Sequence, residues 1–94
     1  MVIGACSLEL SLPGNGSLKG KRQVIKSLMA RLRHEFNVSV AEVGAQDRWQ
    51  AAVIGVACVS SDAAYAHGLL TRVAQWVEEN RLDCDLVDYQ IEIL

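Results

Sequence analysis

The sequence predicts an α+β fold in which a four-stranded antiparallel sheet carries two helices on one face. Apolar residues alternate with polar ones near both ends of the chain, as in half-buried strands, and two longer segments repeat apolar residues at helical spacing. A nearly continuous apolar segment lies between those helices, as in a central strand. The order βαββαβ, with right-handed crossovers, gives a single ferredoxin-like sandwich over residues 1–94, with strand order 4-1-3-2.

The first strand and the first helix have clear signals. Residues 2–12 alternate between apolar and polar side chains and predict the strand. The Pro-Gly-Asn-Gly sequence at residues 13–16 ends it. Ser17 is a favourable N-cap, and the apolar residues of 18–34 recur at helical spacing, which predicts an amphipathic helix of about four to five turns.

The middle of the chain predicts a hairpin. Residues 36–41 alternate again and form the second strand, and residues 44–47 are typical of a hairpin connection. Residues 49–59 predict the third strand. Because residues 51–57 are apolar at nearly every position, we expect this strand to lie inside the sheet.

A second helix and a last strand complete the pattern. Residues 60–62 are suited to cap the helix, whose apolar face runs from Ala66 to Val77. The last strand alternates acidic or amide residues with residues expected to face inward, which are Val87, Tyr89, Ile91 and Ile93.

The composition limits the kind of site that the chain is expected to carry. Its three cysteines, Cys6, Cys58 and Cys84, lie far apart in apolar segments and form no C-x-x-C pair. We therefore expect buried thiols in a reducing cytoplasm, with no metal and no cofactor. No apolar run approaches the roughly 20 residues needed to span a bilayer, and the N-terminus lacks the basic region of a signal peptide, so we expect no membrane association.

Charge is distributed very unevenly along the chain. Residues 17–34 contain six Lys or Arg residues and no acid, whereas the rest of the chain contains three cations and eleven acids. A segment of charge +6 therefore lies in a background of −8, although the net charge is only −2. Such polarity indicates an anionic partner for the first helix, and we expect this partner to be RNA.

Most of these cations form a stripe on the predicted helix. On a helical wheel, Lys19, Arg22, Lys26 and Arg33 fall within about 60° of one another, on one flank of the apolar face. Lys21 falls inside the apolar sector, so we expect its ammonium group to extend outward.

The position of the stripe indicates a bound anion. The start of a helix is the positive pole of its dipole, so cations there are unfavourable, and no acid at i±4 relieves them. Free N–H groups in the preceding loop would donate to the same anion. The candidate nucleic-acid- or anion-binding residues are therefore Gly14, Gly16, Ser17, Lys19, Lys21, Arg22, Lys26 and Arg33.

Two other arrangements would neutralise the stripe, and the sequence leaves them open. If the two helices run antiparallel, Glu78 and Glu79 would lie beside Lys19 and Arg22. Acids also gather on the last strand, where they would block edge-to-edge pairing or receive the basic helix of a second subunit. These acids are Asp83, Asp85, Asp88 and Glu92.

The predicted sheet does not have the surface of an RNA-recognition motif. That motif stacks bases on aromatic side chains of its two central strands. Here those strands offer Gly4, Ala5, Ala51, Val53, Gly55 and Ala57. Such a small, apolar face favours packing against another sheet, so we expect a homodimer through this face or its cover by a partner. Trp49, at the start of the third strand, is either a lid over the core or an interface anchor.

No catalytic residue is predicted. Gly14, Gly16, Arg22 and Asn37 would be the raw materials of acyl phosphate hydrolysis in this fold, but the chain lacks the corresponding loop motif. His34 suits the negative pole at the end of the first helix, and we expect a surface or core-margin position for the second histidine, His67.

Several segments form a recognisable set of motifs. They are Leu-Pro-Gly at 12–14, Ser-Leu-Lys-x-Lys-Arg at 17–22, Lys-Ser-Leu at 26–28, Phe-Asn-Val-Ser-Val-Ala-Glu-Val at 36–43, Trp-Gln at 49–50, Ala-Val-Ile-Gly-Val-Ala at 52–57 and Asp-Tyr-Gln-Ile at 88–91. Together they resemble the YlxP-like family of small bacterial proteins, a domain of unknown function, over nearly the whole chain. Similar members usually have an acid at the position of Gly20, which would complete a capping box with Ser17.

The resemblance implies a ferredoxin-like fold and no established activity. Members of the family are often encoded beside genes for translation initiation and ribosome maturation, which implies a ribosome-associated role. We therefore expect a cytoplasmic, non-enzymatic accessory factor that binds rRNA or a ribosomal particle through its first helix, without specificity for DNA. A small anion- or metabolite-binding regulatory dimer and a protein–protein adaptor are the alternatives.

Overall fold

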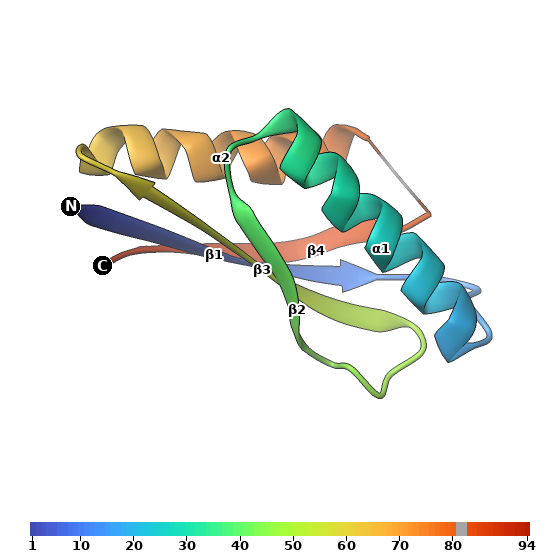
Figure 1. The fold of residues 1–94 in the computed structure, drawn as a ribbon. Coiled ribbons are helices and arrows are strands. Elements are labelled where there is room, and N and C mark those ends of the chain that lie inside the picture. Colours follow the sequence, from blue (N-terminus) through green and yellow to red (C-terminus); the bar gives the residue numbers. More distant parts are fainter. Residues whose placement is uncertain (81–82) are drawn as a thin grey trace.

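The computed structural model describes residues 1–80 and 83–94 of the chain. Its elements follow the predicted order βαββαβ, and both helices lie on the same face of the sheet (Figure 1). The elements are β1 (Val2–Ser11), α1 (Leu18–Glu35), β2 (Ser39–Gly44), β3 (Ala51–Ser60), α2 (Ala63–Glu79) and β4 (Asp85–Ile93). The ferredoxin-like α+β class is confirmed.

The sheet is antiparallel, with the strand order β2-β3-β1-β4. This is the predicted order 4-1-3-2 read from the other edge. β1 and β3 pair along their whole length, from Val2 opposite Ser60 to Ser11 opposite Ala51. The apolar third strand therefore lies inside the sheet, as its composition requires.

Both helices begin at the predicted caps. The hydroxyl of Ser17 accepts a hydrogen bond from the N–H of Gly20 at 3.0 Å, and the carboxylate of Asp62 accepts one from the N–H of Tyr65 at 3.0 Å. Each cap satisfies one of the N–H groups that a helix start leaves without an internal partner. α2 packs over β1, β3 and β4, whereas α1 lies over the edge strand β2 on the same face of the sheet.

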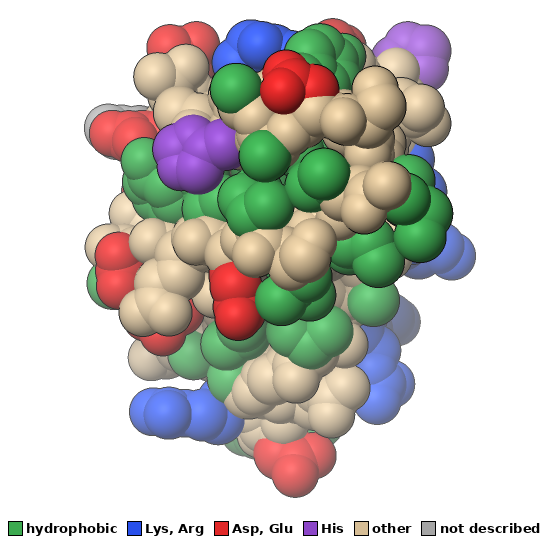
Figure 2. Space-filling view, turned by 90° about the vertical axis from the view of Figure 1, so that its left-hand side faces the viewer, with side chains coloured by type: hydrophobic (Ala, Val, Ile, Leu, Met, Phe, Trp, Pro, Cys, Tyr) green, Lys and Arg blue, Asp and Glu red, His purple; other side chains and the backbone are tan. Residues whose placement is uncertain are grey.

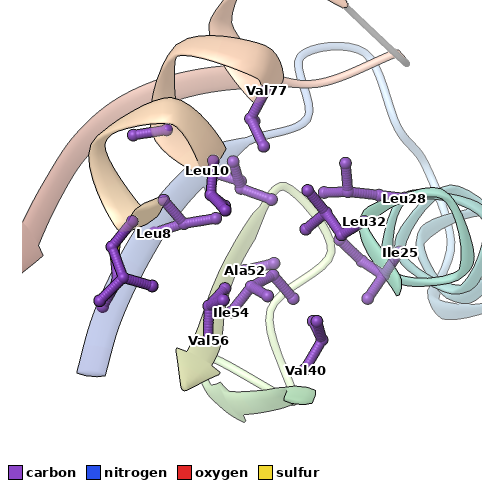
Figure 3. Packing of buried hydrophobic residues seen from close by; sticks show 14 of the residues in the cluster. Leu8, Leu10, Ile25, Leu28, Leu32, Val40, Ala52, Ile54, Val56 and Val77 are labelled. Carbon is purple, nitrogen blue, oxygen red and sulfur yellow. The ribbon is translucent and has the colours of Figure 1, made fainter. Parts of the chain in front are cut away.

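The hydrophobic core fills the space between the sheet and the two helices (Figure 3). Its largest fully buried apolar side chains are Leu8, Leu12, Leu28, Leu32, Ile54, Leu70 and Val73. The three cysteines are also buried. Burial raises the pKa of the Cys6 thiol from 9.0 to about 11, so this thiol stays protonated and unreactive near neutral pH.

The second and third strands begin later than predicted. α1 continues to Glu35 and ends with a bond from the N–H of Phe36 to the carbonyl of Leu32, so residues 36–38 form the turn and not the strand. Phe36 packs edge-on against the ring of Trp76 instead. The hairpin connection is also longer, because Trp49 and Gln50 precede β3.

Two residues lie on the face opposite to the one expected. The pairing of β1 with β4 shifts between Glu9 and Leu10, which leaves Val87 outside the alternation and 65% exposed. Leu86 takes the inward position opposite Leu10. Gly4 faces the helices and not the open side, and a Cβ atom there would lie 2.9 Å from Leu70 Cδ1.

Candidate anion-binding surface

The basic residues of α1 divide into an exposed group and a buried one. Lys19, Arg22, Lys26 and Arg33 are exposed along one flank of the helix, beside its buried face. We call these four residues the cationic stripe. No ion pair joins any of them to an acid in residues 1–80 or 83–94. The first turn of α1 contains no acid either.

Lys21 is not part of this exposed surface, and the expectation that its ammonium group extends outward is wrong. The side chain is 1% exposed. Its Nζ donates to the carbonyl oxygens of Ala45 at 2.6 Å and Arg48 at 2.8 Å, and it lies 3.1 Å from Glu42 Oε2. These partners satisfy the ammonium group inside the protein, so Lys21 has no free donor for a phosphate.

The contact between Lys21 and Glu42 holds α1 to the β2–β3 hairpin. Glu42 Oε2 is buried and accepts no hydrogen bond, so the nearby ammonium charge is what compensates its desolvation. The sequence contains a signal for this pair. Glu42 has the same strand parity as the buried Val40, and Lys21 lies in the apolar sector of α1, so the spacing of both residues directs their side chains toward the core.

The two arginines in the last turns of α1 have internal contacts. Arg33 remains exposed, but its guanidinium also donates to the carbonyl of Val40 at 3.0 Å. Arg31 lies on the other flank, with its guanidinium carbon 5.2 Å from the centre of the Trp76 ring. The free cations of the stripe are therefore concentrated on the first half of α1, at Lys19, Arg22 and Lys26.

The acids of α2 do not neutralise the stripe. Trp76, in the last turns of α2, contacts Arg31 and Phe36 at the end of α1. The C-terminal ends of the two helices are therefore neighbours. Lys19 lies twelve residues before Arg31, about 18 Å away along the helix axis. Glu78 and Glu79 accordingly form no ion pair with Lys19 or Arg22.

The loop before α1 is fixed by Asn15. Its amide nitrogen donates to the carbonyls of Ser17 at 2.8 Å and Trp49 at 2.5 Å. A Cβ atom on Gly20 would lie 2.5 Å from Asn15 Oδ1, so glycine at this position makes room for the Asn15 side chain.

The predicted loop donors Gly14 and Gly16 lie beside open space, since a Cβ atom at either would have no atom within 4 Å. Gly14 has a φ of +77°, a left-handed conformation that glycine adopts without strain. The Ser17 hydroxyl accepts the bond that caps the helix, and its O–H remains available as a donor to an anion. The backbone of this loop thus faces solvent at the start of the stripe.

Trp49 is exposed, so the expectation of a lid over the core is wrong and the interface anchor remains. Its side chain is 53% exposed, in the loop that Lys21 and Asn15 hold against α1. Arg48, Trp49, Gln50 and Ala51 line a shallow hollow of about 450 Å³. Figure 1 shows this β2–β3 loop beside the start of α1.

The open face of the sheet is small and apolar, as predicted for residues other than Gly4. Ala5, Ala41, Val43, Gly55 and Ala57 line a hollow of about 320 Å³ on it. A Cβ atom on Gly55 would lie 3.0 Å from Val43 Cγ1, so the side chain of Val43 covers the glycine. The homodimer that this face predicts stays a prediction.

The residues considered for acyl phosphate chemistry lie far apart. Arg22 and the loop at 14–16 lie at the start of α1, whereas Asn37 follows its end. Fifteen residues separate Arg22 from Asn37, about 20 Å along a helix. Asn37 and Arg22 therefore do not meet at one site.

His34 and His67 are both exposed.

Across the described ranges, no helix is both long enough and apolar enough to cross a membrane.

Comparison with known proteins identifies the family. A model of the family described as "Protein of unknown function (DUF503)" matches residues 3–91. The chain is also similar to the uncharacterised protein YlxP of Bacillus subtilis (strain 168), with 39% identity over 77 residues, covering 82% of this chain and 84% of that protein. Because the family model covers almost the whole chain, the chain belongs to the DUF503 family.

Proposed function

We propose that this protein is a non-enzymatic accessory factor that binds RNA through the cationic stripe, with a ribosomal particle as its natural partner. The observation that carries the proposal is that Lys19, Arg22 and Lys26 are exposed and form no ion pair with any described acid. Phosphate is the anion that such a row of cations fits best, because successive phosphates lie along a backbone as successive cations lie along the helix.

The stability of the helix does not explain these cations. Lys19 lies in the first turn, where the dipole is positive, and no acid in that turn offsets it. Because Lys19 is exposed, its charge costs the folded protein about 0.3–0.5 kcal/mol at low salt. A bound phosphate would reverse the sign of this effect, since the anion interacts favourably with the dipole and with the cations together.

The whole-molecule charge distribution supports the same proposal. In Figure 2, several Lys and Arg side chains line the right-hand edge of the view and several Asp and Glu side chains lie toward the left, although a basic group also lies at the lower left. Residues 17–34, which form most of α1, hold six cations and no acid. Such polarity orients an approaching polyanion toward α1 even though the net charge is −2. Contacts of this kind give affinity with little base specificity. The gene neighbourhood implied by the family resemblance favours ribosomal RNA.

The experiment compares binding of purified small ribosomal subunits and of a structured RNA across a series of salt concentrations. The test variant is Arg22→Glu/Lys26→Glu. Its matched control is Arg31→Glu/Arg72→Glu, which has the same net charge but changes two exposed arginines outside the stripe. The proposal predicts binding that weakens steeply with salt, is lost in the test variant and is largely kept in the control.

Two results would contradict the proposal. Absence of binding at low salt would remove RNA as the partner. Equal loss in the test and control variants would show that only net charge matters and not the stripe. A thermal shift with inorganic phosphate alone, saturating and lost in the test variant, would instead support the small-anion regulatory protein.

A further inference from the structure

We propose that Trp49 is a stacking platform for an unpaired nucleobase, so that the protein binds single-stranded or bulged RNA more tightly than a continuous duplex. This inference rests on the proposed function, because it assigns a base contact next to the phosphate contacts of the stripe. It starts from an exposed tryptophan that neither the core nor the sheet uses. The side chain is 53% exposed, although burial of such a ring is strongly favourable.

The backbone beneath Trp49 is held from several sides. Its carbonyl accepts from Asn15 Nδ2 at 2.5 Å, and the carbonyl of the preceding Arg48 accepts from Lys21 Nζ at 2.8 Å. On the other side, the N–H of Leu12 donates to the carbonyl of Gln50 at 3.0 Å. The ring therefore projects from an ordered support, and a ligand that stacks on it orders little additional chain on binding.

The same contacts hold the Trp49 backbone at the start of α1, where the stripe begins. Asn15 donates both to Trp49 and to the carbonyl of Ser17, the N-cap of α1. One asparagine side chain thus connects the Trp49 backbone to the turn that carries Lys19. Arg48, beside Trp49, adds a further exposed cation to the lining of the hollow. A nucleotide placed here would meet an aromatic face and cationic groups together, as single-stranded RNA requires.

The other two exposed aromatic residues among those described, Tyr65 and Tyr89, do not offer this combination. Tyr89, 39% exposed, lies on β4, at the sheet edge opposite to β2 and α1. Tyr65 is equally exposed, at 56%, but it lies in the first turn of α2, where Arg72 contacts its ring at 6.0 Å. The central strands present Ala5, Gly55 and Ala57 on the open face, so base stacking of the RNA-recognition type is unavailable there. Of these exposed aromatic residues, Trp49 is the one whose backbone is held at the start of α1.

The test uses fluorescence and affinity together. The variant Trp76→Phe leaves Trp49 as the single tryptophan of the chain and therefore as the reporter. We expect a ten-nucleotide single-stranded RNA to quench its fluorescence, and inorganic polyphosphate, which has charge but no bases, to leave it unchanged. In the protein that retains Trp76, Trp49→Ala should weaken single-strand binding by about 5- to 100-fold, and the alternative variant Trp49→Phe should keep most of the affinity.

The controls separate failure of this inference from failure of the proposed function. Tyr65→Ala, which removes an equally exposed ring, should bind single strands like the unmodified protein, and a matched duplex should bind Trp49→Ala and the unmodified protein alike. Unchanged single-strand affinity in Trp49→Ala would overturn the stacking site alone if Arg22→Glu/Lys26→Glu still abolishes binding. If the unmodified protein binds neither RNA at low salt, both proposals fall.

Discussion

Lys21 and Lys19 occupy the same turn of α1 but have opposite relations to the rest of the protein. Lys21 is buried and its ammonium group is satisfied by Glu42 and by carbonyls of the β2–β3 loop. Lys19 is exposed and forms no ion pair among the described residues. Two lysines in one turn of a helix can therefore have different roles. Lys21 joins two elements of the fold, and Lys19 is available to a ligand.

The largest effect expected from this difference is on stability. Lys21→Met should lower the free energy of unfolding by about 3 kcal/mol, because it leaves a buried Glu42 oxygen and two loop carbonyls without their cation. Lys26→Met, on the exposed side of the same helix, should change it by less than about 0.5 kcal/mol. Urea unfolding of both variants measures the contrast, and equal values would remove the structural role of Lys21.

A second contrast concerns the two faces of the molecule that solvent reaches, the charged side of α1 and the apolar face of the sheet. We propose that a second copy of the chain covers the sheet face, since Val43 and Val59 are exposed there beside the apolar hollow. Sedimentation velocity should show a dimer, and Ala57→Arg should convert it to a monomer without unfolding. An unmodified protein that is monomeric at all concentrations would contradict this prediction.

The contact between Asn15 and the start of α1 predicts a smaller change in stability, which a double-mutant cycle can measure. Gly20→Ala should gain little or lose stability in the natural sequence, because the added Cβ would lie 2.5 Å from Asn15 Oδ1. In an Asn15→Ala background the same change should stabilise by up to about 1 kcal/mol, as expected from helix propensity. A double-mutant cycle measures the coupling, and additive effects would show that the two residues do not compete for space.

The smallest expected effects distinguish the two ends of the stripe. Lys19→Gln removes a cation from the positive pole of α1 and should stabilise the protein by a few tenths of a kcal/mol. Arg33→Gln removes a cation from the last turn, together with its bond to the Val40 carbonyl, and should destabilise by about 0.5–1 kcal/mol. Thermal melts at low salt measure the signs. Changes of the same sign would contradict the distinction.

Much of the fold follows from local patterns in the sequence. The caps at Ser17 and Asp62 and the apolar third strand required no knowledge of distant contacts. Boundaries were less predictable, because Phe36 has strand-like spacing but packs on Trp76, a partner 40 positions later. The bulge that exposes Val87 likewise depends on how β4 pairs with β1.

The candidate site was predictable only in part. Helical spacing identified the stripe. Its four cations are exposed, and among the described residues only Arg33 forms an internal hydrogen bond. Helical spacing did not reveal that the ammonium group of Lys21 donates to carbonyls of the β2–β3 loop. Every residue has a backbone carbonyl, so residue types do not indicate which one accepts such a bond. For the same reason, the position of Trp49 beside α1 depends on Asn15 and could not be read from spacing.

The most direct test of the central claim is the salt dependence of RNA affinity, measured for the unmodified protein and for Lys26→Gln. If Lys26 contacts a phosphate, its removal should reduce the slope of log affinity against log salt concentration by about 0.7–0.9, the contribution of one phosphate contact. Lys26→Gln does not disturb any described hydrogen bond or ion pair, so folding should be unchanged. A slope identical to that of the unmodified protein would show that the stripe does not bind phosphate.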